Sequence, residues 1–188
     1  MSKTGKVVKA ITPTESDKAR QKARSAALAA ATDGDWLSMV VQHHRQIEAA
    51  FDKVTTATGA AARVAAQKHL AVILTGHSIA EESVLYPALA RVGSKHDATT
   101  AYTEQAVAKL EMGLLENLAP MSEEYLQKLE HIRAAVAHHM YEEEGTWFIE
   151  LKGKAPSGEQ SKLAERYMEE FDRYVGIDNR PKGARKVA

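Results

Sequence analysis

The chain has 188 residues, with 25 basic and 25 acidic side chains, no net charge and no cysteine. The lack of cysteine excludes disulfides, iron–sulfur clusters, thiolate zinc sites and cysteine nucleophiles, so any metal must be bound by nitrogen and oxygen atoms. Hydrophobic residues make up 44% of the chain and aromatic residues 6%, and neither a signal peptide core nor an apolar run of about 20 residues that could cross a bilayer is found. We therefore expect a cytoplasmic protein without a membrane partner.

The neutral total charge conceals an uneven distribution. Residues 1–32 carry seven Lys and Arg against two acidic residues, and residues 176–188 carry four against one, so the remaining centre has 14 basic and 22 acidic side chains. Basic ends can contact nucleic acid, but no aromatic or glycine-rich recognition module accompanies them. We interpret both ends as solvated tails and do not expect nucleic acid as a partner.

Apolar periodicity and helix-start residues predict an all-helical chain. Ser16, Asp35 and Ser122 are the expected N-caps. The predicted helices cover about residues 16–31, 36–56, 60–90, 98–118, 122–152 and 158–174. Four long helices with short connections fold most simply as an up-down-up-down bundle, so the expected fold class is all-α, a four-helix bundle with extra N-terminal and C-terminal helices.

We expect three parts along the chain. Residues 1–32 form a basic N-terminal extension with a helix, residues 33–153 form the bundle, and residues 154–188 form a C-terminal helix with a basic tail. The terminal helices either pack on the bundle or form the interface of a homodimer.

A repeated motif lies on the second and fourth long helices. His77-x3-Glu81-Glu82 returns 62 residues later as His139-x3-Glu143-Glu144. Because residues four apart share one face of a helix, each copy directs an imidazole and a carboxylate the same way. A further histidine precedes each copy by eight residues, at His69 and His131. We expect these two on the same face, as ordinary core histidines, second-shell donors, a proton route or an extra cation site.

The duplication extends to the first and third long helices. His44 precedes His77 by 33 residues, and Gln105 precedes His139 by 34 residues. Unpaired carboxylates and imidazoles in an apolar bundle core are costly, and a bound cation removes that cost. A single pair would be read as a core histidine and a solvated glutamate, but two matched copies favour a metal site. Mixed nitrogen and oxygen ligands suit iron, with manganese or zinc as alternatives.

These residues resemble those of the hemerythrin-like HHE cation-binding domain family, over about residues 35–152. The resemblance is carried by His44, by His77-x3-Glu81 running into Leu85-Tyr86-Pro87, and by His139-x3-Glu143 running into Trp147-Phe148. It implies a four-helix bundle with a non-heme di-iron centre, in which Glu81 and Glu143 bridge the metals and the histidines are terminal ligands.

The chain departs from the family on the third long helix, where the family usually supplies histidine. Residues 97–130 contain none, and the corresponding segment is Glu104-Gln105. Three arrangements follow: Gln105 binds through its carbonyl oxygen, Glu104 or Tyr102 substitutes, or the position is open. Tyr86 and Tyr102 are also candidate phenolate ligands, which would give the protein a charge-transfer colour.

The resemblance and the buried donor set lead to one functional hypothesis and its alternatives. We expect a di-iron protein that binds or senses dioxygen or another diatomic ligand. The alternatives are a di-iron oxidoreductase acting on peroxide or nitric oxide, an iron storage or delivery protein, and an interaction bundle stabilised by metal. The sequence does not decide whether the protein is an enzyme.

Overall fold

The computed structural model describes residues 15–176, and all regular structure in that range is helical. Its α-helices are α1 (Asp17–Ala30), α2 (Trp36–Thr56), α3 (Ala60–Ala80), α4 (Tyr86–Arg91), α5 (Lys95–Leu115), α6 (Glu123–Glu142), α7 (Phe148–Lys154) and α8 (Ser157–Val175). Two π-helical segments, η3 (Glu81–Leu85) and η4 (Glu143–Trp147), follow α3 and α6 directly. The predicted helical fold class is confirmed.

The predicted helix starts are also confirmed. The side chains of Ser16, Asp35 and Ser122 each accept a hydrogen bond from the backbone N–H three residues later, at 3.3, 2.8 and 3.1 Å. These bonds satisfy N–H groups that have no partner within the helix. One helix differs in both boundaries, since α5 begins at Lys95 and ends at Leu115, about three residues before each predicted limit.

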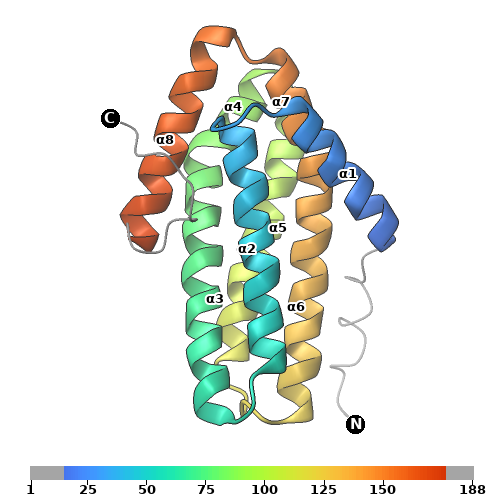
Figure 1. Ribbon diagram of the computed structural model, residues 1–188, viewed down its shortest axis with the longest axis vertical. Coiled ribbons are helices and arrows are strands. Elements are labelled where there is room, and N and C mark those ends of the chain that lie inside the picture. The colour runs from blue at the N-terminus through green and yellow to red at the C-terminus, as the bar shows by residue number, and fades with distance from the viewer. Residues whose placement is uncertain (1–14, 177–188) are drawn as a thin grey trace.

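The long helices α2, α3, α5 and α6 lie side by side, and the terminal helices α1 and α8 flank them toward one end (Figure 1). Helix α8 packs along α3 and α2, while α1 packs on η4, α2 and α7. The approach of α8 to α3 is close at Gly76, where a Cβ atom would lie 2.2 Å from the Val175 side chain. Both terminal helices thus pack on the bundle; a homodimer stays a prediction.

The bundle core is divided into two apolar clusters with a polar layer between them. One cluster contains Val41, Ala80 and Ala101. The other contains Ile47, which follows Val41 in α2, and Leu74, which precedes Ala80 in α3. The polar residues at the border are buried and come from each long helix: His44 of α2, His77 of α3, Gln105 of α5 and His139 of α6. The sequence therefore places its polar candidates in one layer of an otherwise apolar interior.

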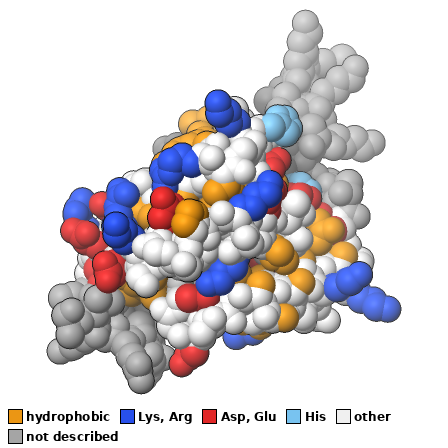
Figure 2. Space-filling view, turned by 90° about the horizontal axis from the view of Figure 1, so that it is seen from above, with side chains coloured by type: hydrophobic (Ala, Val, Ile, Leu, Met, Phe, Trp, Pro, Cys, Tyr) orange, Lys and Arg blue, Asp and Glu red, His pale blue; other side chains and the backbone are white. Residues whose placement is uncertain are grey.

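The face of the molecule seen from above in Figure 2 is mixed in charge. Seen from above, Lys and Arg side chains are interspersed with Asp and Glu side chains (Figure 2). Among residues 15–176, no helix has both the length and the apolar character required to cross a membrane. Residues 1–14 and 177–188 lie outside the described residues. The rest of the basic N-terminal end forms α1, which packs on the bundle, so the expectation of a solvated tail is wrong there.

Candidate metal centre

Both copies of the repeated motif end an α-helix and begin a π-helical turn at their first glutamate. The N–H of Tyr86 bonds to the carbonyl of Glu81, and the N–H of Phe148 bonds to that of Glu143, each closing a turn of five residues. Such π-turns are rare and occur frequently at functional sites. The sequence predicted continuous helices over 60–90 and 122–152, so the two π-turns correct that prediction.

Four donor atoms converge at the centre of the polar layer. The imidazole nitrogens of His44 and His77 and the carboxylate oxygens of Glu81 and Glu143 all lie within 4.8 Å of one another. His44 Nε2 is 3.3 Å from Glu143 Oε2, and His77 Nε2 is 3.2 Å from Glu81 Oε2. Bonds of about 2.0–2.2 Å to one ion place neighbouring donors roughly 3 to 4 Å apart. The spacing therefore fits a single cation among the four side chains.

These donors lack other partners. His44 Nε2, His77 Nε2, Glu81 Oε1 and Glu143 Oε2 are buried and make no hydrogen bond. Buried polar atoms without partners are unusual, because each costs free energy. A cation accepted by all four removes this cost, so the residues fit a metal ion.

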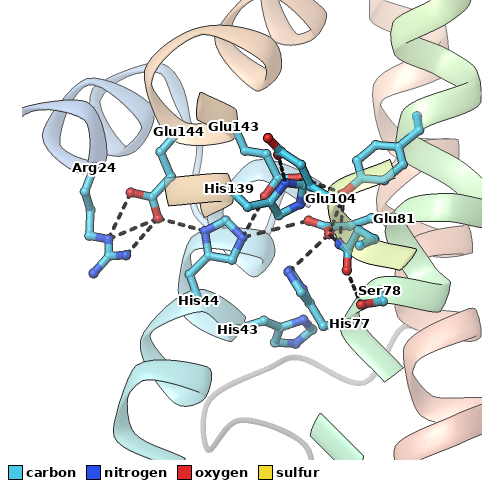
Figure 3. A network of polar contacts seen from close by, with 12 residues as sticks. Arg24, His43, His44, His77, Ser78, Glu81, Glu104, His139, Glu143 and Glu144 are labelled. Carbon is cyan, nitrogen blue, oxygen red and sulfur yellow. Dashed lines mark hydrogen bonds and ion pairs between the residues drawn. The ribbon is translucent and has the colours of Figure 1, made fainter. Parts of the chain in front are cut away.

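The His44 imidazole is held from behind by two charged residues. Its Nδ1 lies 2.8 Å from Glu144 Oε1, which is itself 3.0 Å from Nη2 of Arg24 in α1 (Figure 3). Arg24 also binds Glu48, at 2.7 Å. This chain fixes the orientation of the ring and directs Nε2 at the donor cluster, as second-shell carboxylates do for metal-bound histidines.

The His77 imidazole is held by helix α8. Its Nδ1 lies 2.9 Å from the hydroxyl of Tyr167, and Nδ1 of His43 lies 2.8 Å from the same hydroxyl. His43 stacks on Phe171 at 3.8 Å between ring centroids. With Nδ1–H of His77 donating to Tyr167 and Tyr167 donating to His43, the Nε2 atom of His77 keeps its lone pair for a cation.

His139 lies on the other side of the two carboxylates. Its Nδ1 is 2.8 Å from Glu104 Oε2, and its Nε2 is 3.0 Å from the Tyr86 hydroxyl and 3.2 Å from Glu143 Oε1. Gln105 donates to the same hydroxyl at 2.9 Å. Unlike the nitrogens of the four-donor cluster, His139 Nε2 has a hydrogen-bond partner.

In the metal-free protein, bound protons balance the negative charge of the carboxylates at the centre. Burial lowers the pKa of His44, but the carboxylates of Glu143, Glu144 and Glu81 beside the ring outweigh burial and raise it well above its usual range. Burial and the charge of Glu143 raise the pKa of Glu81 to about 7. Burial and the neighbouring His44 lower the pKa of His77 well below its usual value. A cation would therefore enter by displacing protons from His44 and Glu81.

The imidazole of His139 is also positively charged in the metal-free protein. Burial lowers the pKa of His139, but the charge of Glu143 and the hydrogen bond to Glu104 raise it to about 10. Burial and the two nearby carboxylates, Glu143 and Glu81, raise the pKa of Tyr86 well above its usual range, so the phenol keeps its proton. The hydrogen-bonded side of the carboxylates thus carries its own positive charge.

The structure places the other candidates in different ways. Glu104 contacts His139 rather than the donor cluster, and Gln105 and Tyr86 contact the outer carboxylate oxygens. Tyr102 is 40% exposed and donates to the backbone carbonyl of Glu82, so it does not reach the site.

The expectation for the upstream histidines is wrong. His69 is exposed and His131 is only half-buried, so they do not form an inward pair. At 3.6 residues per turn, eight residues rotate the side chain about 80° away from the starting direction. That rotation moves both histidines from the inner face toward solvent.

Sequence reasoning missed the residues that hold the histidines in place. Arg24 and Tyr167 come from the terminal helices, and Ser78 donates to Gln105. Glu144, which contacts His44, belongs to the repeated motif itself. The invariant spacing of the motif gives no signal for the others, because their contacts depend on how α1 and α8 pack.

Comparison with known proteins identifies a family. The hemerythrin HHE cation binding domain matches residues 37–174, which includes most of α8. A curated relative, the DNA nickase of Nostoc sp. strain PCC 7120, is 27% identical over 94 residues, or 50% of this chain. The chain covers only 27% of the length of that nickase. No solved structure matches the chain.

Proposed function

The chain belongs to the hemerythrin HHE cation-binding domain family, and from this premise we propose that it is a non-heme iron protein that binds or senses dioxygen or another diatomic ligand. The observation that carries the proposal is the convergence of four buried donor atoms without hydrogen-bond partners, from His44, His77, Glu81 and Glu143. We take α2, α3, α5 and α6 as the up-down-up-down bundle that presents them.

The donor chemistry supports iron. Two imidazoles and two carboxylates form a mixed nitrogen and oxygen set, which suits iron or manganese better than calcium or magnesium and also accepts zinc. Four protein donors leave coordination positions open on an ion that takes five or six ligands. Bound iron supplies a redox-active centre with affinity for diatomic ligands.

The surrounding residues keep the centre dry and rigid. The four donor residues are at most 1% exposed and lie between the two apolar clusters. Glu144 and Tyr167 fix the two imidazoles. Exclusion of water and a fixed donor geometry both favour reversible binding of a small apolar ligand over its protonation and reduction.

The direct test is metal analysis with optical spectroscopy on protein purified from iron-supplemented cells. We expect iron in the wild-type protein and near-ultraviolet bands that vanish on reduction and return in air. His77→Ala should abolish both signals, and His69→Ala, an exposed histidine on the same helix, should preserve them. A protein that purifies with zinc, or an iron protein whose spectrum ignores both dioxygen and nitric oxide, would contradict the proposal.

One observation favours an enzyme as the second candidate. The Tyr86 hydroxyl lies 2.9 Å from Glu143, within the buried centre, where it can deliver a proton. Proton donation beside a metal promotes the reduction of peroxide or nitric oxide rather than reversible binding. Steady consumption of hydrogen peroxide that falls in Tyr86→Phe but not in Tyr102→Phe would support this activity, and its absence in the iron-loaded wild type would exclude it.

Nicking of DNA follows only from the name of the relative. The matched 94 residues are a minor part of that protein, and the surface seen in Figure 2 carries interspersed charges rather than a basic track. Incubation of the iron-loaded protein with supercoiled plasmid tests the activity. Relaxed circles that disappear in His77→Ala would make the chain a nickase.

A further inference from the structure

The two oxygens of each central carboxylate face different environments. Glu81 Oε1 and Glu143 Oε2 point into the donor cluster and have no hydrogen-bond partner. The outer oxygens, Glu81 Oε2 and Glu143 Oε1, lie 3.1 and 2.9 Å from the Tyr86 hydroxyl, and Glu81 Oε2 is also 3.2 Å from His77 Nε2 of the cluster. In a two-metal site both outer oxygens would be free to bind a second ion, but here they already have partners.

The Tyr86 hydroxyl occupies the middle of the outer donor set. Besides the two carboxylates, it lies 3.0 Å from His139 Nε2 and 2.9 Å from Gln105 Nε2. All of these residues are buried. A second cation would need the outer carboxylate oxygens and His139 Nε2 as ligands, and these are the atoms that surround the hydroxyl. The phenol oxygen therefore lies where that cation would lie.

The amide of Gln105 reinforces this arrangement. Its oxygen accepts a hydrogen bond from the Ser78 hydroxyl, so its NH2 group faces the centre and donates to Glu81 Oε2 at 2.8 Å as well as to Tyr86. An amide nitrogen offers no lone pair to a metal, and its N–H groups repel a cation. Reversal of the amide would place its oxygen against the Glu81 carboxylate without a proton between them. The network thus fixes the amide in the orientation that does not bind metal.

From this geometry we propose that the chain binds one metal ion, at His44, His77, Glu81 and Glu143, and that Tyr86 and Gln105 replace a second ion by hydrogen-bonding to the outer carboxylate oxygens. This inference rests on the proposed function, because it specifies the number of ions at the same centre. His139 is then a positioning residue for Tyr86 and Glu143 rather than a ligand. A centre with one iron exchanges single electrons.

The test is the number of irons per chain, measured together with electron paramagnetic resonance of the oxidised protein. The wild type is loaded with ferrous iron under anaerobic conditions, desalted and oxidised in air. We expect one iron per chain with the low-field signal of an isolated high-spin ferric ion, whose integrated intensity matches the iron content. Two irons per chain with a silent spectrum, the mark of a coupled pair, would overturn the inference and leave the proposed function intact.

Other wild-type outcomes separate the two proposals. A visible phenolate-to-iron absorption band that is lost in Tyr86→Phe would overturn the inference, because Tyr86 would then be a ligand. Failure to bind iron at all would overturn the proposed function and this inference with it. The stoichiometry and the presence of the band are both measured on the wild-type protein, and Tyr86→Phe serves only to assign the band to Tyr86.

A double variant tests the role of the two residues. Tyr86→Phe with Gln105→His removes the hydroxyl and supplies an imidazole, so it should bind two irons per chain and lose the signal of the isolated ion. The control is Tyr102→Phe alone. This tyrosine packs against Tyr86 at 5.1 Å between ring centroids but does not contact the carboxylates. It should keep one iron. A folded double variant that still binds one iron would contradict the assignment of Tyr86 and Gln105 as substitutes for the second ion.

Discussion

The two copies of the His-x3-Glu motif have the same backbone and different partners. Each ends an α-helix, begins a π-turn at its glutamate, and places imidazole and carboxylate 3.2 Å apart. His77 Nε2 has no hydrogen-bond partner, whereas His139 Nε2 contacts the Tyr86 hydroxyl. A repeated sequence thus yields one half with free donors and one half whose donors are satisfied.

The difference comes from the helices packed against each copy. His77 and His44 are held through Nδ1 by residues of α8 and η4, which leave the inner nitrogens free. His139 is held by Glu104 of α5, and the same helix contributes Gln105 to the outer network. Motif spacing sets the direction of a donor, and the neighbouring helix determines whether the donor is available.

The largest expected effect is that substitution of the histidine in the first motif copy, but not in the second, abolishes metal binding. His77→Ala removes a donor of the four-atom cluster and should abolish iron binding, whereas His139→Ala should keep one iron per chain. Metal analysis after anaerobic loading measures both, with thermal unfolding followed by circular dichroism to show that each variant folds. Equal loss of iron in the two variants would show that the halves are functionally equivalent.

A smaller effect is expected from the residues behind the imidazoles. Tyr167→Phe and Glu144→Gln each weaken the orientation of a cluster histidine, and loss of such a partner typically lowers metal affinity about 10–100-fold. Glu104→Gln alters the partner of His139 and should leave the affinity unchanged. Competition with a chromophoric chelator gives the three dissociation constants, and a large effect of Glu104→Gln would place His139 among the ligands.

The packing of α8 against the helix that carries the first motif copy can be tested at its close approach to α3. A Cβ at Gly76 would lie 2.2 Å from Val175, so Gly76→Ala should lower the free energy of unfolding by about 1–3 kcal/mol through overpacking. Gly113, in α5, has no atom within 4 Å of a Cβ position, and Gly113→Ala should raise that free energy by roughly 0.5–1 kcal/mol. Chemical denaturation of the metal-free proteins measures both, and a neutral Gly76→Ala would mean that α8 can shift freely.

A gradual effect is expected from pH, which changes metal affinity without any substitution. Metal displaces a proton from His44, whose pKa is raised well above its usual range, and below about pH 7 also from Glu81, whose pKa is raised to about 7. Affinity should therefore rise with pH, by about tenfold per unit for each proton displaced.

The pH slope also distinguishes the two halves. His139, with a pKa raised to about 10, would release a further proton if it were a ligand. His139→Ala should consequently leave the slope unchanged between pH 6 and 8, as measured by chelator competition in buffers of matched ionic strength. A shallower slope in the variant would show that metal binding involves the His139 imidazole.

Much of the fold was predictable because its signals are local. Three N-caps and the apolar periodicity placed the helices, and the duplicated motif located the inward donors, since residues four apart share a helix face. The π-turns were not predictable, because an α-helix and a π-turn have the same residue pattern over five positions. The eight-residue spacing of His69 and His77 misled in the same way, through a rotation that a short pattern does not reveal.

The sequence by itself determined that the chain is helical, that it belongs to a cation-binding family and that histidines and glutamates recur at metal-ligand spacing. Tertiary structure alone decided which of these donors are free. Tyr167 contacts His77 and Arg24 contacts Glu144 from helices at opposite ends of the chain, and Gln105 turns its NH2 group toward the centre through the contact with Ser78. Spacing along a helix fixes direction within that helix, whereas the satisfaction of a buried polar atom depends on every element packed around it.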